Sequence, residues 1–157
     1  MKNLTITLAL VFSTFAMAGL PDFPRGPDTT LTPGTLCTTP STYRYPERIA
    51  YCERNVSGDE KQEIFAMYRA KGFRLSGDRG DYKIDHFMPL CAGGSNEKTN
   101  LWPQHKTVYG ITDPIEELGC QKLAMARITQ KDLVTLIKIA KYDLSKVPQV
   151  IQRLRSL

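Results

Sequence analysis

The part of the sequence that decides the fold reads YKIDHFMPL at residues 82–90, followed by CAGGSN at 91–96 and NLWPQH at 100–105. Apolar and polar side chains alternate in the first segment, which predicts a half-buried strand. Pro89 ends that pattern because proline has no N–H to donate to a strand ladder. The paired glycines of the second segment predict a loop. The sequence therefore places a strand and a loop ahead of the third segment.

The only two histidines of the chain, His86 and His105, lie in this stretch. A neutral imidazole can take a proton from water, and the Asp85 carboxylate beside His86 can hold a hard divalent cation. Together they would supply the activated water and the Lewis acid that phosphodiester hydrolysis needs. Adjacent side chains on a regular strand point to opposite faces, however. Asp85 and His86 can therefore line one pocket only if the strand twists or ends there.

The pattern D-H-x-x-P-L-x-x-G-G-x-N at 85–96, with N-L-W-P-Q at 100–104, resembles the HNH endonucleases of the His-Me finger (ββα-metal) superfamily. It is most similar to the branch that bacteria export. About 23 residues, 82–104, carry the resemblance, and YCERNVS at 51–57 also resembles that branch. The resemblance implies an α+β fold in which a strand, a loop, a strand and a helix surround one metal ion. Additional helices and disulfides would pack around and staple this small core.

The resemblance also implies roles for individual residues. Asp85 would be a metal ligand, and His86 would be the general base that deprotonates the attacking water. Asn100 would orient the His86 ring through a hydrogen bond, or would join the metal shell. Trp102 is expected to pack in the core, with base stacking as the minor alternative.

The sequence departs from the usual family pattern at one metal ligand. That pattern has a further histidine about nine residues after the asparagine, where this chain has Tyr109. His105 is the only imidazole left, and we expect it to supply the ligand from the start of the following helix. Mg²⁺ is the expected metal, and a site that includes His105 would also accept Mn²⁺, Ni²⁺ or Zn²⁺.

The first 18 residues have the features of a signal peptide. A short basic opening precedes an apolar run, and Ala16-Met17-Ala18 offers the small residues that signal peptidase accepts. The alternative, an uncleaved membrane anchor, is disfavoured because Pro21 interrupts the run before about 20 apolar residues are reached. Cleavage after Ala18 would leave residues 19–157, exported to the periplasm or secreted, without stable membrane association.

The four cysteines, Cys37, Cys52, Cys91 and Cys120, all lie in the exported part. An even number of cysteines in an exported chain predicts two disulfides. Of the three possible pairings, Cys37–Cys52 with Cys91–Cys120 is favoured because each bond closes a loop within one half. A four-thiolate zinc site is disfavoured because the chain has no C-x-x-C pair.

The composition is that of one globular domain. Hydrophobic residues make up 41% and charged residues 24% of the 157 residues, which excludes a disordered tail and a multi-span membrane protein. Residues 19–46 contain six of the ten prolines and predict an extended arm that lies on the domain. The nuclease-like domain would be 47–157, with the ββα motif at about 80–111 and a helical segment at 112–157.

Capping residues and apolar spacing predict the helices. Ser57, with Glu60 three residues later, predicts the start of a helix over 57–72. Asp113-Pro114 resembles a helix opening, as does the segment that begins at Thr129. Ser145 and Pro148 would open a last short helix.

Positive charge gathers at the C-terminal end. The chain has a formal net charge of +5, and residues 118–157 hold eight basic but only two acidic side chains. This local excess favours contact with a phosphate backbone, although a solvated helix face is the simpler alternative. The side chains expected to contact nucleic acid are Lys106, Lys122, Arg127, Lys131 and Lys138.

The leading hypothesis from the sequence is a monomeric, metal-dependent endonuclease that hydrolyses phosphodiester bonds, in DNA and with little sequence preference. The rival is a non-catalytic exported module that keeps the ββα scaffold and binds nucleic acid or a protein, which the missing histidine favours. A toxin delivered to competitors, with an inhibitor protein as its partner, is a third possibility.

Overall fold

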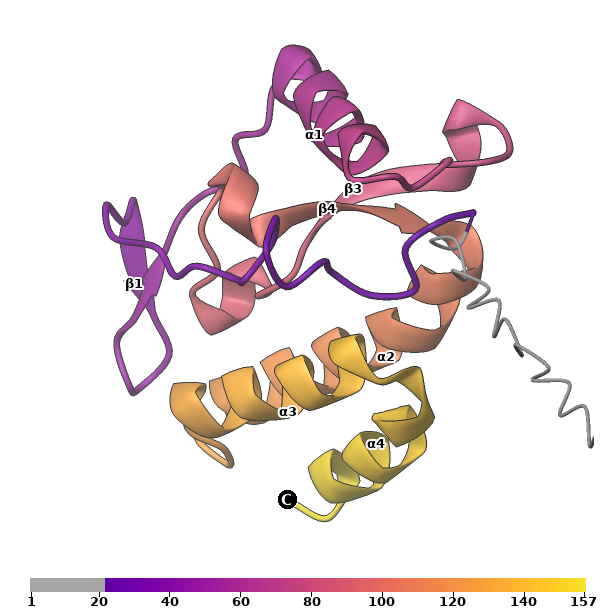
Figure 1. The fold of residues 1–157 in the computed structure, drawn as a ribbon. Helices are drawn as coiled ribbons and strands as arrows, with labels where there is room; N and C mark the ends of the chain where they lie inside the picture. The colour runs from indigo at the N-terminus through magenta and orange to yellow at the C-terminus, as the bar shows by residue number, and fades with distance from the viewer. Residues whose placement is uncertain (1–21) are drawn as a thin grey trace, which may run out of the picture.

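The computed structural model describes residues 22–157, and the expected signal peptide at 1–18 lies outside this part. The described chain has a mixed α+β fold with two small antiparallel sheets, four α-helices and several short 3₁₀ turns (Figure 1). The strands are β1 (Thr42–Arg44), β2 (Ile49–Tyr51), β3 (Tyr82–His86) and β4 (Leu101–His105), and the helices are α1 (Gly58–Ala70), α2 (Lys106–Ala124), α3 (Gln130–Tyr142) and α4 (Val147–Arg155). The expected α+β class is confirmed.

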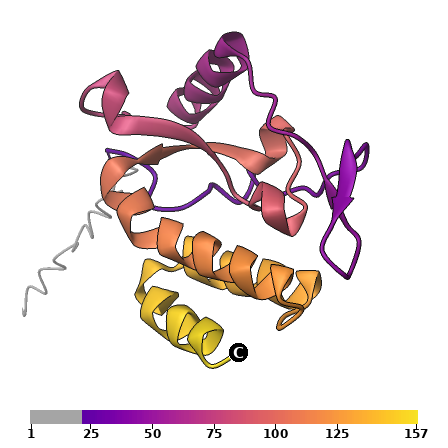
Figure 2. The ribbon, with the colours of Figure 1, turned by 180° about the vertical axis from the view of Figure 1, so that it is seen from behind.

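Strands β3 and β4 pair antiparallel in the centre of the molecule, and α2 follows β4 directly. The register pairs His86 with Leu101 at one end and Tyr82 with His105 at the other. Helix α1 lies on one side of this hairpin, while α2, α3 and α4 lie on the other (Figures 1 and 2). The two histidines therefore lie at opposite ends of the central hairpin.

Helix α1 forms where the sequence predicts it. The Ser57 side chain accepts from the backbone N–H of Glu60, and the Glu60 carboxylate accepts from the backbone N–H of Ser57. The stripe Ile64, Phe65 and Tyr68 is buried. The predicted N-terminal cap and the predicted apolar face of this helix are both confirmed.

The helix opening predicted at Asp113-Pro114 is wrong, whereas the expectation of a helix that starts at His105 is confirmed by α2. The helix begins at Lys106, with His105 as its N-cap, and runs continuously past Pro114. A proline inside a helix removes one backbone hydrogen bond. Pro114 lies on the exposed face, and the opposite face buries an apolar stripe that includes Val108 and Ile115. Packing of that stripe outweighs the missing bond.

Helix α3 begins at its predicted cap, whereas α4 begins at Val147, after a 3₁₀ turn that contains the predicted Ser145. The Thr129 side chain accepts from the backbone N–H of Asp132 at the start of α3. Asp143 caps the 3₁₀ turn that leads into α4, and Pro148 sits in the first turn of that helix. Within residues 22–157, no helix combines the length and apolar composition needed to cross a membrane.

Both predicted disulfides are present, Cys37–Cys52 and Cys91–Cys120, each with a Cα–Cα distance of 5.8 Å. The second bond ties the 3₁₀ turn after β3, Leu90–Ala92, to helix α2. In the chain-entropy model a closed loop of about 15 residues contributes roughly 3 kcal/mol. The two bonds therefore fasten the long connection between β3 and β4 and the segment before β1 to the rest of the chain.

The proline-rich segment lies against the central hairpin. The Thr32 hydroxyl lies 2.8 Å from the Tyr68 hydroxyl of α1 and donates to the backbone oxygen of Leu101 in β4. Leu36 forms an isolated bridge with Gly94. A Cβ at Gly94 would collide with the backbone oxygen of Met88. Glycine is therefore required where the arm and the loop meet.

Candidate functional site

Asp85 and His86 are neighbours on β3, and both are buried, with 8% and 3% of their surface exposed. Their side chains have different partners. Asp85 contacts lysines of β3 and α3, whereas the His86 ring contacts Arg54 and Asn96. The alternation of a regular strand explains this separation. The two side chains therefore do not line one pocket, as a metal ligand and a general base of the same site would.

The environment of His86 fixes which ring nitrogen carries the proton. The Asn96 amide donates through Nδ2 to the backbone oxygen of Glu53 at 2.7 Å, so its Oδ1 faces His86 Nε2 at 3.0 Å and accepts from it. Arg54 Nη1 lies 3.3 Å from His86 Nδ1. Because a guanidinium only donates, Nδ1 must carry the lone pair.

The protonation state of His86 follows from its burial. Burial lowers the pKa of the ring below its ordinary value of 6.5, and the positive charge of Arg54 lowers it further. The hydrogen bond with Asn96 acts in the opposite direction but does not reverse the shift. His86 is therefore neutral at neutral pH, with a basic nitrogen directed at an arginine.

Arg54 comes from the segment between β2 and α1, and it is exposed. Its Nη2 donates to the backbone oxygen of Ile84 at 2.9 Å, which holds the guanidinium against β3. Within residues 22–157 no carboxylate forms an ion pair with it. Arg54 and Asn96 also line an open polar pocket of about 520 Å³, together with Ser41, Glu53, Asn55 and Ser95 among others. An exposed, unpaired guanidinium thus lies between this pocket and the basic nitrogen of His86.

Asp85 belongs to a buried network of charges. Its Oδ2 lies 3.2 Å from Lys141 Nζ, and its Oδ1 lies 3.5 Å from Lys83 Nζ. Lys141 is 1% exposed, lies 2.6 Å from Glu116 Oε1, and donates to the backbone oxygen of His86 at 2.7 Å. Strand β3 and helices α2 and α3 each contribute to this network.

The network shifts the pKa of each member. Burial alone would raise the pKa of Asp85, but the ammonium groups of Lys141 and Lys83 outweigh it and lower that pKa. Burial alone would lower the pKa of Lys141, and the carboxylates of Glu116 and Asp85 raise it instead. Burial raises the pKa of Glu116 to about 7, despite the opposing charge of Lys141. Asp85 and Lys141 are therefore both charged at neutral pH.

The side chains around Asp85 do not fit the divalent ion that the sequence leads us to expect. Both carboxylate oxygens face an ammonium group, which would repel a metal cation. In addition, residues 22–157 contain no group of three His, Cys, Asp or Glu side chains placed to hold a metal ion. The two lysines therefore take the positions around Asp85 that a metal ion would need.

Asn100 does not contact the His86 ring in this structure. Its Oδ1 accepts from the backbone N–H of Met88 at 2.8 Å, and its Nδ2 donates to the backbone oxygens of Met88 and Ser95 at 3.0 and 2.8 Å. The side chain is fully buried. Asn100 thus braces the connection between β3 and β4, while Asn96 orients the ring.

Replacing Asn100 by alanine is expected to destabilise the protein. It would leave the Met88 N–H and two carbonyl oxygens buried without their partner, at about 1–3 kcal/mol for an unsatisfied group. Urea denaturation should show a lower midpoint, whereas Asn55→Ala, at an exposed asparagine, should change the free energy of unfolding by less than about 0.5 kcal/mol. Equal stability of the two variants would contradict this bracing role.

His105 lies at the far end of the hairpin, paired with Tyr82. Its ring stacks on Phe23 with a centroid distance of 4.1 Å, and its Nδ1 accepts from the Thr107 hydroxyl at 2.8 Å. Nδ1 also accepts from the backbone N–H of Thr107 at the start of α2. The structure therefore gives His105 a capping role and does not bring it to Asp85.

The expected nucleic-acid contacts are spread over α2, the turn that follows it and α3. Lys106 forms an ion pair with Asp81 at 2.7 Å. The other four, Lys122, Arg127, Lys131 and Lys138, have no acidic partner within the described residues. Lys141, which the sequence counts in the same basic segment, is inside the molecule and adds no charge to that surface.

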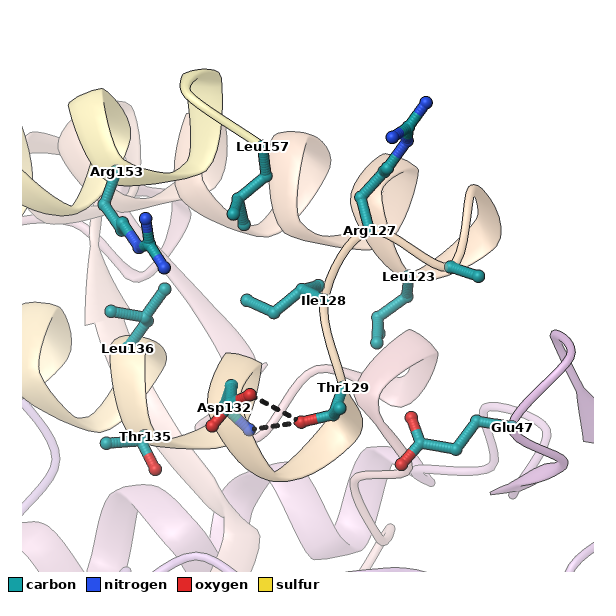
Figure 3. Close-up of a pocket in the computed structure, with 11 residues that line it drawn as sticks. Glu47, Leu123, Arg127, Ile128, Thr129, Asp132, Thr135, Leu136, Arg153 and Leu157 are labelled. Carbon is teal, nitrogen blue, oxygen red and sulfur yellow. Dashed lines mark hydrogen bonds between the residues drawn. The ribbon is translucent and has the colours of Figure 1, made fainter.

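A second pocket, of about 550 Å³, lies where the turn between α2 and α3 meets α4 (Figure 3). Leu123, Ile128 and Leu136 are among its apolar lining residues, and Arg127 and Arg153 also line it. None of the residues that contact the Asp85 or His86 side chain lines this pocket. It is slightly larger than the polar pocket beside Arg54, but it holds none of the candidate catalytic groups.

Sequence reasoning missed four residues of the site: Arg54, Asn96, Glu116 and Lys141. Arg54 and Asn96 both fall in segments that carry the family resemblance, so that signal was present. Glu116 and Lys141 read as ordinary charged positions on helices. Comparisons with protein-family models, with curated proteins and with solved structures found no match to this chain.

Proposed function

We propose that this protein is a phosphodiester hydrolase, an endonuclease that acts on DNA with little sequence preference. The observation that carries the proposal is the neutral, buried His86, whose Nδ1 lone pair faces the exposed Arg54 guanidinium. A poised base beside a phosphate-binding group is the pair that phosphodiester hydrolysis requires. In this proposal β3, β4 and α2 form a ββα core of the His-Me finger type, in an exported, disulfide-bonded monomer.

The proposed reaction uses both groups in one step. Arg54 binds a non-bridging oxygen of the scissile phosphate and moves off His86 Nδ1, which becomes accessible to a water molecule. The water oxygen forms a bond to phosphorus while its proton passes to Nδ1, and the bond to the leaving sugar oxygen breaks. Solvent protonates the leaving oxygen. The Asn96 carbonyl, which accepts from Nε2–H, stabilises the imidazolium that forms.

The proposal is tested with purified residues 19–157 on supercoiled plasmid, single-stranded DNA and RNA, each with added divalent ions and with EDTA. Nicked and then linear plasmid is the expected product. Cleavage of RNA alone would change the substrate class. Binding without cleavage of any substrate would support the rival, a non-catalytic module, which the lysine-paired Asp85 already favours.

The pH dependence of cleavage is expected to reflect His86. A general base works only when deprotonated, so the rate should rise with pH through the pKa of His86 and level off above it. Burial lowers that pKa, so the midpoint of the rise should lie below pH 6.5. Initial nicking rates in buffers from about pH 4.5 to 8 at constant ionic strength test this. A rate that still rises steeply above about pH 7 would exclude His86 as the titrating base.

Replacing Arg54 by alanine is expected to lower kcat/KM by about 10–100-fold, since a hydrogen bond to a charged group contributes about 1.5–3 kcal/mol. Arg54→Lys should recover part of this loss, because it keeps the charge but not the two-pronged geometry. Arg48→Ala, at an exposed arginine in the β1–β2 hairpin, is the matched control. Equal cleavage by the Arg54 and Arg48 variants would remove Arg54 from the mechanism.

A further inference from the structure

The Lys141 ammonium sits in a cage of three oxygen atoms. They are Asp85 Oδ2 at 3.2 Å, Glu116 Oε1 at 2.6 Å and the backbone oxygen of His86 at 2.7 Å. The ammonium donates hydrogen bonds to Asp85 Oδ2 and to the backbone oxygen of His86, whereas its contact with Glu116 Oε1 is an ion pair without hydrogen-bond geometry. Strand β3 and helix α2 supply the cage, and α3 supplies the cation.

The oxygens of the cage are those that a hard divalent cation selects, namely two carboxylates and a carbonyl. In this protein the positive charge among these oxygens is the Lys141 ammonium. Lys141 is 1% exposed and extends from the buried face of α3, which also holds Ile137 and Ala140. The packing of that helix face therefore keeps the ammonium in the cage.

We propose that Lys141 is a built-in cation that occupies the place of a divalent ion between Asp85 and Glu116. The ammonium neutralises Asp85 and fixes the backbone oxygen of His86, so it is a positioning residue for the proposed base. A consequence is that cleavage persists in EDTA; this consequence and the positioning role rest on the proposed function, whereas the cation cage does not. Removal of the Lys141 side chain should free the oxygens of the cage for a divalent ion, while Lys83 stays 3.5 Å from the other oxygen of Asp85, Oδ1.

The experiment measures Mn²⁺ binding to residues 19–157 by electron paramagnetic resonance, with thermal unfolding as a second readout. Wild type should bind no Mn²⁺ that depends on Asp85. Lys141→Ala should bind one ion about tenfold or more tightly than wild type, and Mn²⁺ should raise its Tm. The double variant Lys141→Ala/Asp85→Asn should lose both effects. Lys138→Ala, on the same helix, should behave as wild type.

Two results would overturn the proposal. One is stoichiometric Mn²⁺ binding by wild type that Asp85→Asn abolishes. The other is a folded Lys141→Ala variant that binds no Mn²⁺. If Lys141→Ala folds neither with nor without Mn²⁺, the proposal is tested by Mn²⁺ binding to wild type and to Asp85→Asn alone. If no substrate is cleaved but Mn²⁺ binds as expected, the nuclease proposal is refuted and the cation cage stands. If cleavage is sensitive to EDTA and wild type binds Mn²⁺ through Asp85, the cation cage is refuted and the nuclease proposal stands.

Discussion

Substitution of His86 by alanine is expected to lower plasmid cleavage by about 10²–10⁴-fold, the usual contribution of a general base. The Nδ1 lone pair, set by Asn96 on one side and Arg54 on the other, is the group that would be lost. Initial rates of nicking, measured at equal protein and plasmid concentrations, give the change directly. The circular dichroism spectrum should match that of wild type, because neither partner of the ring is itself removed.

His105→Ala is the matched comparison, since it removes the only other imidazole. His105 caps α2 and stacks on Phe23 at the far end of the hairpin, so its loss should reduce stability more than cleavage. Full activity of His86→Ala would contradict the proposed mechanism. Loss of activity in His105→Ala alone, with its fold intact, would instead restore the role that the sequence predicts for that residue.

Replacing Lys141 by alanine is expected to lower the free energy of unfolding by about 3–5 kcal/mol, the typical effect of removing one partner of a buried ion pair. The substitution would leave Glu116 without an ion-pair partner among residues 22–157 and would leave Asp85 with Lys83 alone. It would also remove the donor to the backbone oxygen of His86. Urea denaturation at neutral pH in the presence of EDTA measures the loss without interference from metal ions.

Lys138→Ala provides the control on the same helix, because Lys138 is half-buried and has no acidic partner within residues 22–157. It should change stability by less than about 1 kcal/mol. A similarly small effect of Lys141→Ala would show that the ammonium is not a structural part of the core. The large difference expected between these two lysines of one helix follows from the burial and ion pairing of Lys141.

Local signals in the sequence were sufficient for much of the fold. The capping box at Ser57 determines where α1 begins, and the threonine cap at Thr129 determines α3, because both act within one helical turn. The disulfide pairing also followed from loop closure within each half. Local capping signals misplaced the start of α2 at Asp113-Pro114, because its true cap is an atypical histidine, and only the family resemblance predicted a helix from His105.

The same division applies to the candidate site. The sequence by itself placed Asp85 and His86 on one strand and left open whether that strand twists or ends so that both side chains line one pocket. Only the tertiary structure decided what each side chain meets. Asn96 rather than Asn100 holds the ring, and Lys141, which the sequence does not distinguish from a solvated lysine, enters the core beside Asp85. Contacts between residues 55 or more positions apart depend on how α3 packs under the hairpin, and no local pattern encodes that packing.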